Sequence, residues 1–573
     1  MNARRWRLGR WFPFLDWPRP DLGTLNGELW AGITVGLMVI PQGVAYAGLA
    51  GMPLVTGIYA SMLPALVAVL WSSSVRLSVG PTALSCLLVY SSLIDLAQPG
   101  STEWVNLAVW LALLSGLAQV VLGCVRFGWL LNVVSSPVLM GFTQAAAILI
   151  LASQVPALFG FRSGWSRMIA HPDLHWLAAL FGLASLAALI VSRRFAPRFP
   201  AVVLVVLAAS GLSALIGFEA GGGRVVGQLA AGLPALHIPS ALPWATFGQL
   251  VVPVLVITLV SFLETASSAK VDSQRGGKRW NQDQDLIGQG LAKIASGLCG
   301  AFPTSSSFSR SALNLYAGAK TGWATIVSVA VVLLVLLFLT PVLRYVPQAV
   351  LGAVVVAATY GLLKPSAFAR VWRVSRVEAL IAAVTFAVTV LTAPNLYWGV
   401  IAGMLMSLSH FLYQRLHPRI VEVGLHPDGS LRERERWQLP PLAPRVYAVR
   451  MDAALDFASA ADFERVLTEH LGNAPDTEHL CLFAGSINRI DATGVECFAQ
   501  LRHTLAERDI VLHIAGMKLP VEIALQRSGD LGEGPLLRLY RTDAEALQAM
   551  REIAASTDSA PAVADANAEA LRP

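Results

Sequence analysis

Long runs of apolar residues constrain the fold of this chain more than any other feature. The runs TIVSVAVVLLVLLFLT (325–340) and ALIAAVTFAVTVLTA (379–393) contain no charged side chain. Segments of about twenty such residues are typical of helices that cross a bilayer, because a helix satisfies its own backbone polar groups in lipid. Of the 573 residues, 55% are hydrophobic and only 14% are charged. We therefore predict a polytopic α-helical membrane protein.

Roughly fourteen apolar segments precede Tyr413, and they divide into two halves of seven. An odd number of segments in each half inserts the second half into the membrane inverted with respect to the first. The predicted segments start near Leu29, Leu54, Pro81, Trp104, Pro137, Leu174, Ala201, Leu250, Leu286, Phe308, Thr325, Ala349, Ala379 and Leu396.

The third and tenth segments are short and occupy equivalent places in the two halves. They lie in SVGPTALSCLLVYSSLID (78–95) and FPTSSSFSRSALNLYAG (302–318). A helix that begins inside the membrane directs unpaired N–H groups and the positive end of its dipole at the midplane. Two such ends facing each other predict an anion site in a transporter. The alternative is that a membrane protein rich in Pro and Gly shows such breaks by chance.

One carboxylate, Glu264, lies in the apolar stretch 251–270. A charge at bilayer depth costs about 2.5–3.5 kcal/mol on insertion scales, so such a residue usually faces a cavity and has a function. We expect Glu264 to exchange a proton near neutral pH and to couple transport to it. The alternative is an interfacial carboxylate paired with another basic residue or with Lys270, which lies roughly 9 Å further along the helix.

The second short segment carries a cation at its start. The guanidinium of Arg310 would add a full charge to the partial charges of the two helix ends and bind a small oxyanion. Ser307, Ser309 and Thr82 could donate hydroxyl hydrogen bonds to the same anion. Alternatively, Arg310 has a structural role, either paired with Glu264 or extended toward the membrane surface.

The first segment contributes an amide and a phenol on one helix face. Gln42 and Tyr46 lie four residues apart, so their side chains are neighbours and suit the wall of a polar pocket. Pro41 would kink the helix there and free backbone groups. Aromatic packing is the alternative role for Tyr46.

The formal charge of +6 reflects membrane topology rather than a nucleic-acid partner. Arg and Lys are concentrated in the loops of one side, which predicts that both termini are cytoplasmic. The five cysteines form no CxxC pair or metal spacing, and no HExxH, GxSxG or Walker A pattern occurs. We expect no enzyme activity, no metal and no cofactor other than a coupling proton or sodium ion.

The domain boundaries follow from changes of composition. Residues 1–27 are predicted as a cytosolic N-terminal segment and 28–415 as the transmembrane domain. A charged linker, 416–445, leads to a soluble domain at 446–552, whose strands alternate with helices and predict an α/β layer. The tail 553–573 lacks large apolar residues and is predicted to be disordered.

These segments resemble a known family. The stretches 41–84, FLETASSAK (262–270), 285–322 and LTPVLRYVPQAVLGAVVV (339–356) are similar to the sulfate permease (SulP) anion transporters, which include the animal motor protein prestin. LDFASAADFERVL and INRIDATGVECFAQL resemble the STAS domain that ends those proteins. The similarity extends from about Asp16 to Leu547.

The resemblance implies a fold of fourteen segments in 7+7 inverted repeats, divided into a core and a gate bundle. It also implies elevator-type transport, a homodimer, and an anion held between the third and tenth segments. Glu264 matches the acidic position tied to proton coupling, and Glu264 followed by Thr265 fits that type better than the sodium-bicarbonate type. The residues implied to bind substrate are Gln42, Tyr46, Thr82, Ala83, Ser307, Phe308, Ser309 and Arg310.

One departure concerns the soluble domain. Ala492 stands where STAS-domain anti-anti-sigma factors carry a phosphorylated Ser, which argues against a phosphorylation switch at this residue. We therefore interpret the domain as a regulatory or assembly module that binds a cytosolic protein.

Our leading hypothesis is a proton-coupled symporter of sulfate, bicarbonate, nitrate or C4-dicarboxylates in a bacterial inner membrane. The alternatives are an anion exchanger, a sodium-coupled bicarbonate carrier, or a sensor or scaffold built on the STAS domain.

Overall fold

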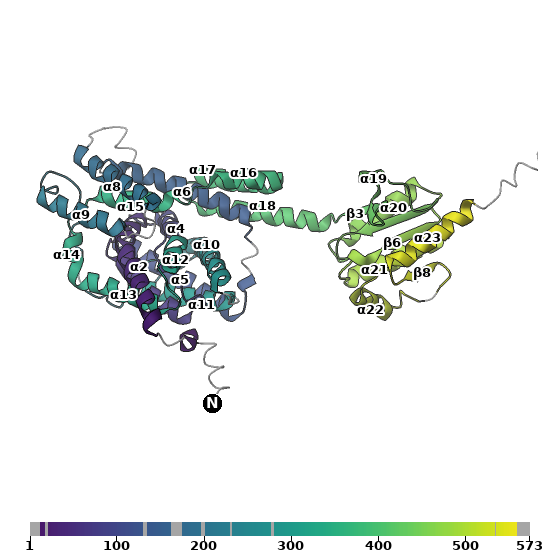
Figure 1. Cartoon of the computed structure of the whole chain (residues 1–573), viewed down its shortest axis with the longest axis horizontal. Coiled ribbons are helices and arrows are strands. Elements are labelled where there is room, and N and C mark those ends of the chain that lie inside the picture. Colours follow the sequence, from purple (N-terminus) through teal and green to yellow (C-terminus); the bar gives the residue numbers. More distant parts are fainter. Residues whose placement is uncertain are drawn as a thin grey trace, which may run out of the picture. The chain divides into compact units, whose positions relative to one another are not determined.

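The chain forms two compact units in this computed structural model, and the boundary between them lies inside helix α18 (Figure 1). The units are Met1–Ser407 and Leu408–Pro573. The structure describes residues 12–17, 21–129, 134–161, 175–195, 201–229, 232–276, 280–532 and 534–558.

The first unit is built almost entirely of helices. Within the described residues, seven helices are long and apolar enough to cross a membrane, by length and composition. Its helices are η1 (Pro13–Asp16), α2 (Leu22–Leu49), α3 (Thr56–Trp71), α4 (Ala83–Leu93), α5 (Thr102–Cys124), α6 (Ser136–Leu158), α8 (Trp176–Phe195), α9 (Ala201–Leu215), α10 (Trp244–Gly276), α11 (Gln282–Leu298), α12 (Phe308–Tyr316), α13 (Trp323–Leu334), the π-helical turn η3 (Val335–Leu339), α14 (Thr340–Leu343), α15 (Gln348–Tyr360), α16 (Pro365–Val374), α17 (Arg376–Leu391) and α18 (Tyr397–Leu416).

Each predicted apolar segment corresponds to one helix of this unit, and the predicted fold class is confirmed. The predicted start Leu174 lies outside the described residues, and its helix, α8, is described from Trp176. Helix α2 begins at Leu22, inside the predicted N-terminal segment, because Asp21 and Thr24 form a capping box there.

The helices of the first unit pack as two bundles. Helices α2, α3, α5, α10, α11 and α13 contact one another, and α6, α8, α15 and α17 form the second group. Helices related by the repeat make equivalent contacts: α6 packs on α17 as α8 packs on α15, and α2 packs on α13 as α10 packs on α5. These pairings are those of two inverted repeats divided into a core and a gate bundle.

The second unit is a six-stranded sheet covered by helices. The strand order is β4-β3-β5-β6-β7-β8, with β5 to β8 parallel and β3 antiparallel to both of its neighbours. The elements are β3 (Ile420–Leu425), β4 (Leu431–Glu433), α19 (Arg434–Trp437), β5 (Val446–Met451), α20 (Ala460–Asn473), β6 (His479–Phe483), η4 (Ala484–Ser486), α21 (Ala492–Glu507), β7 (Val511–Ala515), α22 (Leu519–Ser528), β8 (Leu537–Tyr540) and α23 (Asp543–Asp558).

Two separate cores stabilise this sheet, one on each face. Successive strand residues point to opposite faces, so Leu480 and Leu482 of β6 pack with α20, α21 and α22. Cys481 and Phe483 of the same strand pack with Met550 of α23, which Figure 1 shows across the sheet. The predicted α/β layer is present.

The prediction that 416–445 is a linker is wrong, because this stretch has regular structure. It contains β3, β4 and α19, and β3 pairs with β5 through Ile420 and Val421. In IVEVGL, the apolar Val421, Val423 and Leu425 occupy alternate positions, a pattern typical of a strand. Glu422 of β3 pairs with Arg434, with their Oε1 and Nη1 atoms 2.7 Å apart.

The helix α23 continues to Asp558, so the first residues of the predicted disordered tail are helical. The remainder of that tail, 559–573, lies outside the described residues, as do residues 1–11 of the N-terminal segment.

Candidate functional site

The two short helices begin side by side. Strand β1 (Val79–Gly80) precedes α4 and pairs antiparallel with β2 (Ser305–Ser306), which precedes α12. The Ser307 amide donates to the Ser78 carbonyl oxygen at 2.9 Å and extends this pairing. The predicted meeting of the two half-helix starts is therefore confirmed, and their unpaired N–H groups lie in one region.

A hydroxyl side chain caps each of these helices. Thr82 is the N-cap of α4, and its oxygen accepts a hydrogen bond from the Ser85 amide at 3.3 Å. Ser307 is the N-cap of α12 and accepts from the Arg310 amide at 3.5 Å. Each cap satisfies one N–H group of its helix, and the other amides of the first turn stay directed at the junction.

Arg310 lies almost fully buried at this junction, with 1% of its surface exposed. Its Nε donates to Ser78 Oγ at 3.2 Å, and its Nη1 donates to the Pro81 carbonyl at 2.9 Å and to Gln42 Oε1 at 3.4 Å. Within the described chain, its Nη2 has no hydrogen-bond partner. The guanidinium thus anchors the strand before α4 and has one buried donor without a partner among the described residues.

Glu264 of α10 contacts the start of α4. Its Oε2 accepts from Thr82 Oγ1 at 3.1 Å and from Ser85 Oγ at 3.4 Å. Among the described residues it forms no ion pair within 4.0 Å with Lys270 or with Arg310, so neither alternative pairing of Glu264 occurs. Thr82 is therefore both the N-cap of α4 and a hydrogen-bond donor to the Glu264 carboxylate.

Gln42 and Tyr46 of α2 are both buried, with 2% and 5% of their surfaces exposed. Gln42 contacts Arg310 as described, and no hydrogen bond of the Tyr46 hydroxyl is recorded within the described part of the chain. Helix α2 approaches α3 closely because both residues at the crossing are glycines. A Cβ on Gly57 would lie 1.9 Å from the carbonyl oxygen of Gly43.

The remaining predicted site residues are less enclosed. Ala83 is buried at the first position of α4, whereas Phe308 and Ser309 are exposed in the first turn of α12, Phe308 by 50%. The hydroxyl oxygens of Ser307 and Ser309 are 3.3 Å apart. The structure therefore brings Gln42, Arg310, Thr82 and Glu264 together, with Phe308 and Ser309 at an open edge.

Sequence reasoning missed one charged residue near this site. Lys293 of α11 is fully buried and donates to Gln119 Oε1 at 2.8 Å and to Ser261 Oγ at 2.9 Å. Ser261 lies one helical turn before Glu264 on α10. The sequence signal that could have identified it is a single lysine among small and apolar residues. An ionisable residue inside a membrane segment usually has a function.

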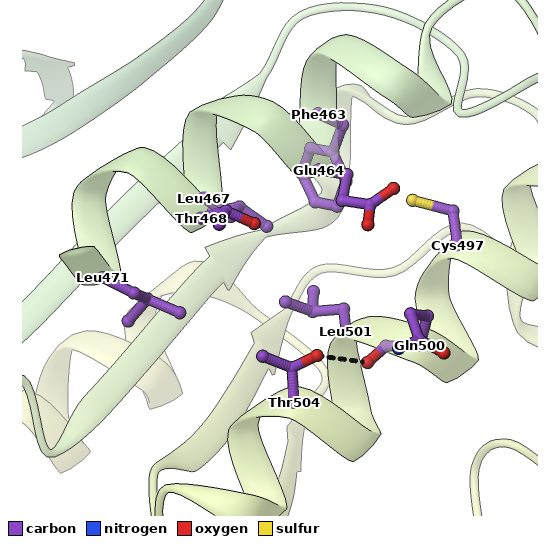
Figure 2. Close-up of a pocket in the computed structure, with 9 residues that line it drawn as sticks. All are labelled: Phe463, Glu464, Leu467, Thr468, Leu471, Cys497, Gln500, Leu501 and Thr504. Carbon is purple, nitrogen blue, oxygen red and sulfur yellow. Dashed lines mark hydrogen bonds between the residues drawn. The ribbon is translucent and has the colours of Figure 1, made fainter.

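A cavity in the second unit is too small to serve as the substrate site. Figure 2 shows it between α20 and α21, where Leu467 and Leu501 line its apolar side and Glu464 and Cys497 its polar side. Its volume of about 30 Å³ holds roughly two water molecules. The neighbouring α21 begins at Ala492, the position that lacks a phosphorylatable hydroxyl.

The sequence comparisons decide the family. Residues 25–385 match the sulfate permease family, and residues 441–546 match the STAS domain. This chain belongs to the sulfate permease family. A probable sulfate transporter of Mycobacterium tuberculosis is 31% identical over 92% of this chain and 95% of its own length. A probable sulfate transporter of Arabidopsis thaliana is 32% identical over 88% of this chain and 77% of its own length.

Solved structures share the fold of this sulfate permease family member. The murine solute carrier 26 family member A9 anion transporter, in the inward-facing state, superposes with a TM-score of 0.85 at 20% identity, covering 96% of this chain and 95% of that one. The transmembrane domain of the cyanobacterial bicarbonate transporter BicA gives 0.57 at 20% identity, covering 67% and 98%. The resemblance inferred from the sequence is confirmed, including the STAS domain.

Proposed function

We propose that this protein is a proton-coupled symporter of small oxyanions, with sulfate as the leading substrate. The observation that carries the proposal is the buried Arg310 guanidinium, whose Nη2 donor lacks a protein partner at the junction of α4 and α12. A charge-assisted hydrogen bond from this donor, together with two helix N-termini, suits an oxyanion. The names of the similar proteins support sulfate over the other oxyanions.

The contact between Thr82 and Glu264 supports coupling to a proton. Across the 3.1 Å contact of their oxygens, an ionised Glu264 can accept the Thr82 hydroxyl hydrogen, whereas a protonated carboxyl can donate instead. Because Thr82 also caps α4, the protonation state of Glu264 acts directly on one half of the anion site. Proton uptake and anion binding then favour each other.

A sodium-coupled bicarbonate carrier is the second candidate. The oxygens of Ser261, one turn before Glu264 on α10, and of its partner Gln119 could coordinate a cation, but both already accept hydrogen bonds from Lys293. This buried cation favours the proton over sodium as the coupling ion.

The remaining parts of the proposal concern the assembly. We propose that the core bundle moves against the gate bundle in an elevator-like step, that the protein is a homodimer of the inner membrane with cytoplasmic termini, and that the STAS domain is regulatory and binds a cytosolic protein.

Uptake of labelled sulfate into proteoliposomes tests the proposed function. We expect sulfate to accumulate when the outside is more acidic than the lumen and to stop accumulating when the pH gradient is collapsed. Uptake that depends on a sodium gradient but not on a proton gradient would support the bicarbonate carrier instead. No uptake of sulfate, nitrate, bicarbonate or succinate under any gradient would contradict transport and favour a scaffold.

A further inference from the structure

We propose that Lys293 sets the charge of the anion site, so that the site suits a divalent oxyanion when Glu264 is protonated. This inference rests on the proposed function and extends it, because it names the charge class of the substrate and a residue that determines it. Lys293 acts at a distance, as a residue that sets the local potential and does not touch the anion.

Lys293 belongs to a closed hydrogen-bond network between three helices. Gln119 of α5 donates its Nε2 to the Thr258 carbonyl and to Ser261 Oγ, both at 3.0 Å. These bonds fix the amide so that Oε1 faces Lys293. The Ser261 hydroxyl donates to the Thr258 carbonyl at 3.2 Å, so its oxygen is left to accept from Lys293 and Gln119.

This network places two acceptor oxygens against the lysine nitrogen. Both partners of Nζ, Gln119 Oε1 and Ser261 Oγ, are acceptors, and neither has a hydrogen left to donate to it. An ammonium group, which has three donors and no acceptor, can donate to both oxygens. A buried charge is costly unless it is paired or hydrogen-bonded, and the two bonds of Nζ offset part of that cost.

The close contact of α5 with α11 holds this lysine in place. A Cβ on Gly116 would lie 2.7 Å from the Gly290 carbonyl oxygen, and a Cβ on Gly290 would lie 2.6 Å from the Gly116 carbonyl oxygen. Gln119 and Lys293 follow these glycines by three residues on their respective helices. Lys293 and its amide partner are therefore fixed one turn beyond a tight helix crossing.

The charges that face Glu264 determine which anion the site favours. The titratable and charged groups that interact with Glu264 are Lys293 of α11, Arg310 of α12, Tyr46 of α2 and Cys86 of α4. At acidic pH, where Lys293 and Arg310 are both charged and Tyr46 and Cys86 are neutral, a protonated Glu264 leaves two positive charges. Ionisation of Glu264 lowers the net charge of these groups by one. Binding of a proton to Glu264 therefore favours binding of a dianion.

The test compares sulfate with nitrate uptake in proteoliposomes that contain the full chain. In the wild type we expect the ratio of sulfate to nitrate uptake to rise as the pH falls. In Lys293→Gln, whose amide can still donate to Gln119 and Ser261, we expect this ratio to fall by about tenfold at acidic pH. In Glu264→Gln, which lacks the titrating carboxylate, we expect the ratio to be as high as in the wild type at acidic pH and to change less with pH.

Lys270→Gln is the matched control, because Lys270 is an exposed lysine of α10 outside the network. It should keep the wild-type ratio. If Lys293→Gln does not fold, as judged by gel filtration, Lys293→Met, a second uncharged variant of similar length, replaces it in the same comparison, and an unchanged ratio in that variant would equally overturn the inference. A wild-type ratio that does not change with pH, or an unchanged ratio in a folded Lys293→Gln, would overturn this inference. Wild-type sulfate uptake without proton dependence would instead overturn the proposed coupling.

Discussion

At the scale of single residues, the site combines a few charges with hydroxyl groups that connect them. Arg310 keeps a buried donor, and Thr82 contacts both the α4 backbone and Glu264. Each of these residues was predicted from its position at the start of a short segment or within an apolar one. Their contacts could not be predicted, because the two segments are more than two hundred residues apart in the chain.

Replacing Arg310 should weaken the binding of the anion. Arg310→Ala removes the free Nη2 donor and a full positive charge, so we expect the affinity for sulfate to fall by about 1–3 kcal/mol. Titration of the purified protein with sulfate, followed by thermal shift, measures this. Because the side chain also anchors Ser78 and Pro81, unfolding in the absence of sulfate is the control. Wild-type affinity would show that Arg310 is only structural.

Neutralising Glu264 should uncouple transport from the proton. Glu264→Gln keeps the size of the side chain and can still contact Thr82, but it cannot exchange a proton. We expect sulfate exchange across the membrane to persist while accumulation driven by a pH gradient is lost. Labelled sulfate counterflow, measured beside gradient-driven uptake in the same vesicles, separates the two activities. Unchanged gradient-driven accumulation would refute the assignment of Glu264.

A buried histidine should make the STAS domain less stable in acid. His513 of β7 is 3% exposed and bonds His479 at 3.1 Å and the Tyr540 hydroxyl at 3.0 Å. Burial, with a smaller effect of His479, lowers the pKa of His513 from 6.5 to about 4. Because the unfolded chain binds the proton more tightly, stability is full above about pH 6.5 and declines toward pH 4, by up to about 3 kcal/mol.

Urea unfolding of the second unit between pH 7 and pH 4.5 measures this decline, and His513→Phe should flatten it. An equally steep decline in the folded His513→Phe variant would show that other groups cause the loss. His479, whose pKa is also lowered by burial, is the first of these to replace.

At the scale of elements, close helix crossings position the side chains of the site. The crossing of α2 with α3 at Gly43 and Gly57 fixes the helix that carries Gln42 and Tyr46. Sequence periodicity gives the helices themselves, since lipid requires every backbone group to be satisfied within the segment. Periodicity does not predict how closely two helices approach where they cross, because that distance depends on which glycines of two distant segments meet.

A larger residue at one of these helix crossings should weaken sulfate binding, although the substituted residue lies outside the site. In Gly57→Ala the new Cβ would clash with the Gly43 carbonyl, so we expect destabilisation by roughly 1–3 kcal/mol and a loss of sulfate affinity. Thermal unfolding in detergent and sulfate titration measure the two effects. The matched control is Gly211→Ala in α9, where an added Cβ meets nothing within 4 Å and alanine favours the helix. Equal behaviour of the two variants would contradict this role for the crossing.

At the scale of the whole molecule, the membrane unit and the STAS domain have separate hydrophobic cores. We therefore expect a chain that ends after Leu416, at the end of α18, to remain folded and to bind sulfate. Gel filtration and sulfate titration of this truncated chain test the expectation. A chain that aggregates in detergent, while the full-length protein does not, would show that the STAS domain is needed for folding or assembly.

The sequence by itself determined the class of this protein, its helices and the two short segments. These features follow from local rules: apolar length fixes a membrane helix, and Pro, Thr and Ser mark where one begins. Only the tertiary structure decided that β1 pairs with β2 and that the stretch before Val446 forms strands of the sheet. It also decided that Lys293 bonds to Ser261, one turn before Glu264. The physical reason is that each of these contacts joins segments distant in the chain, and packing selects such partners.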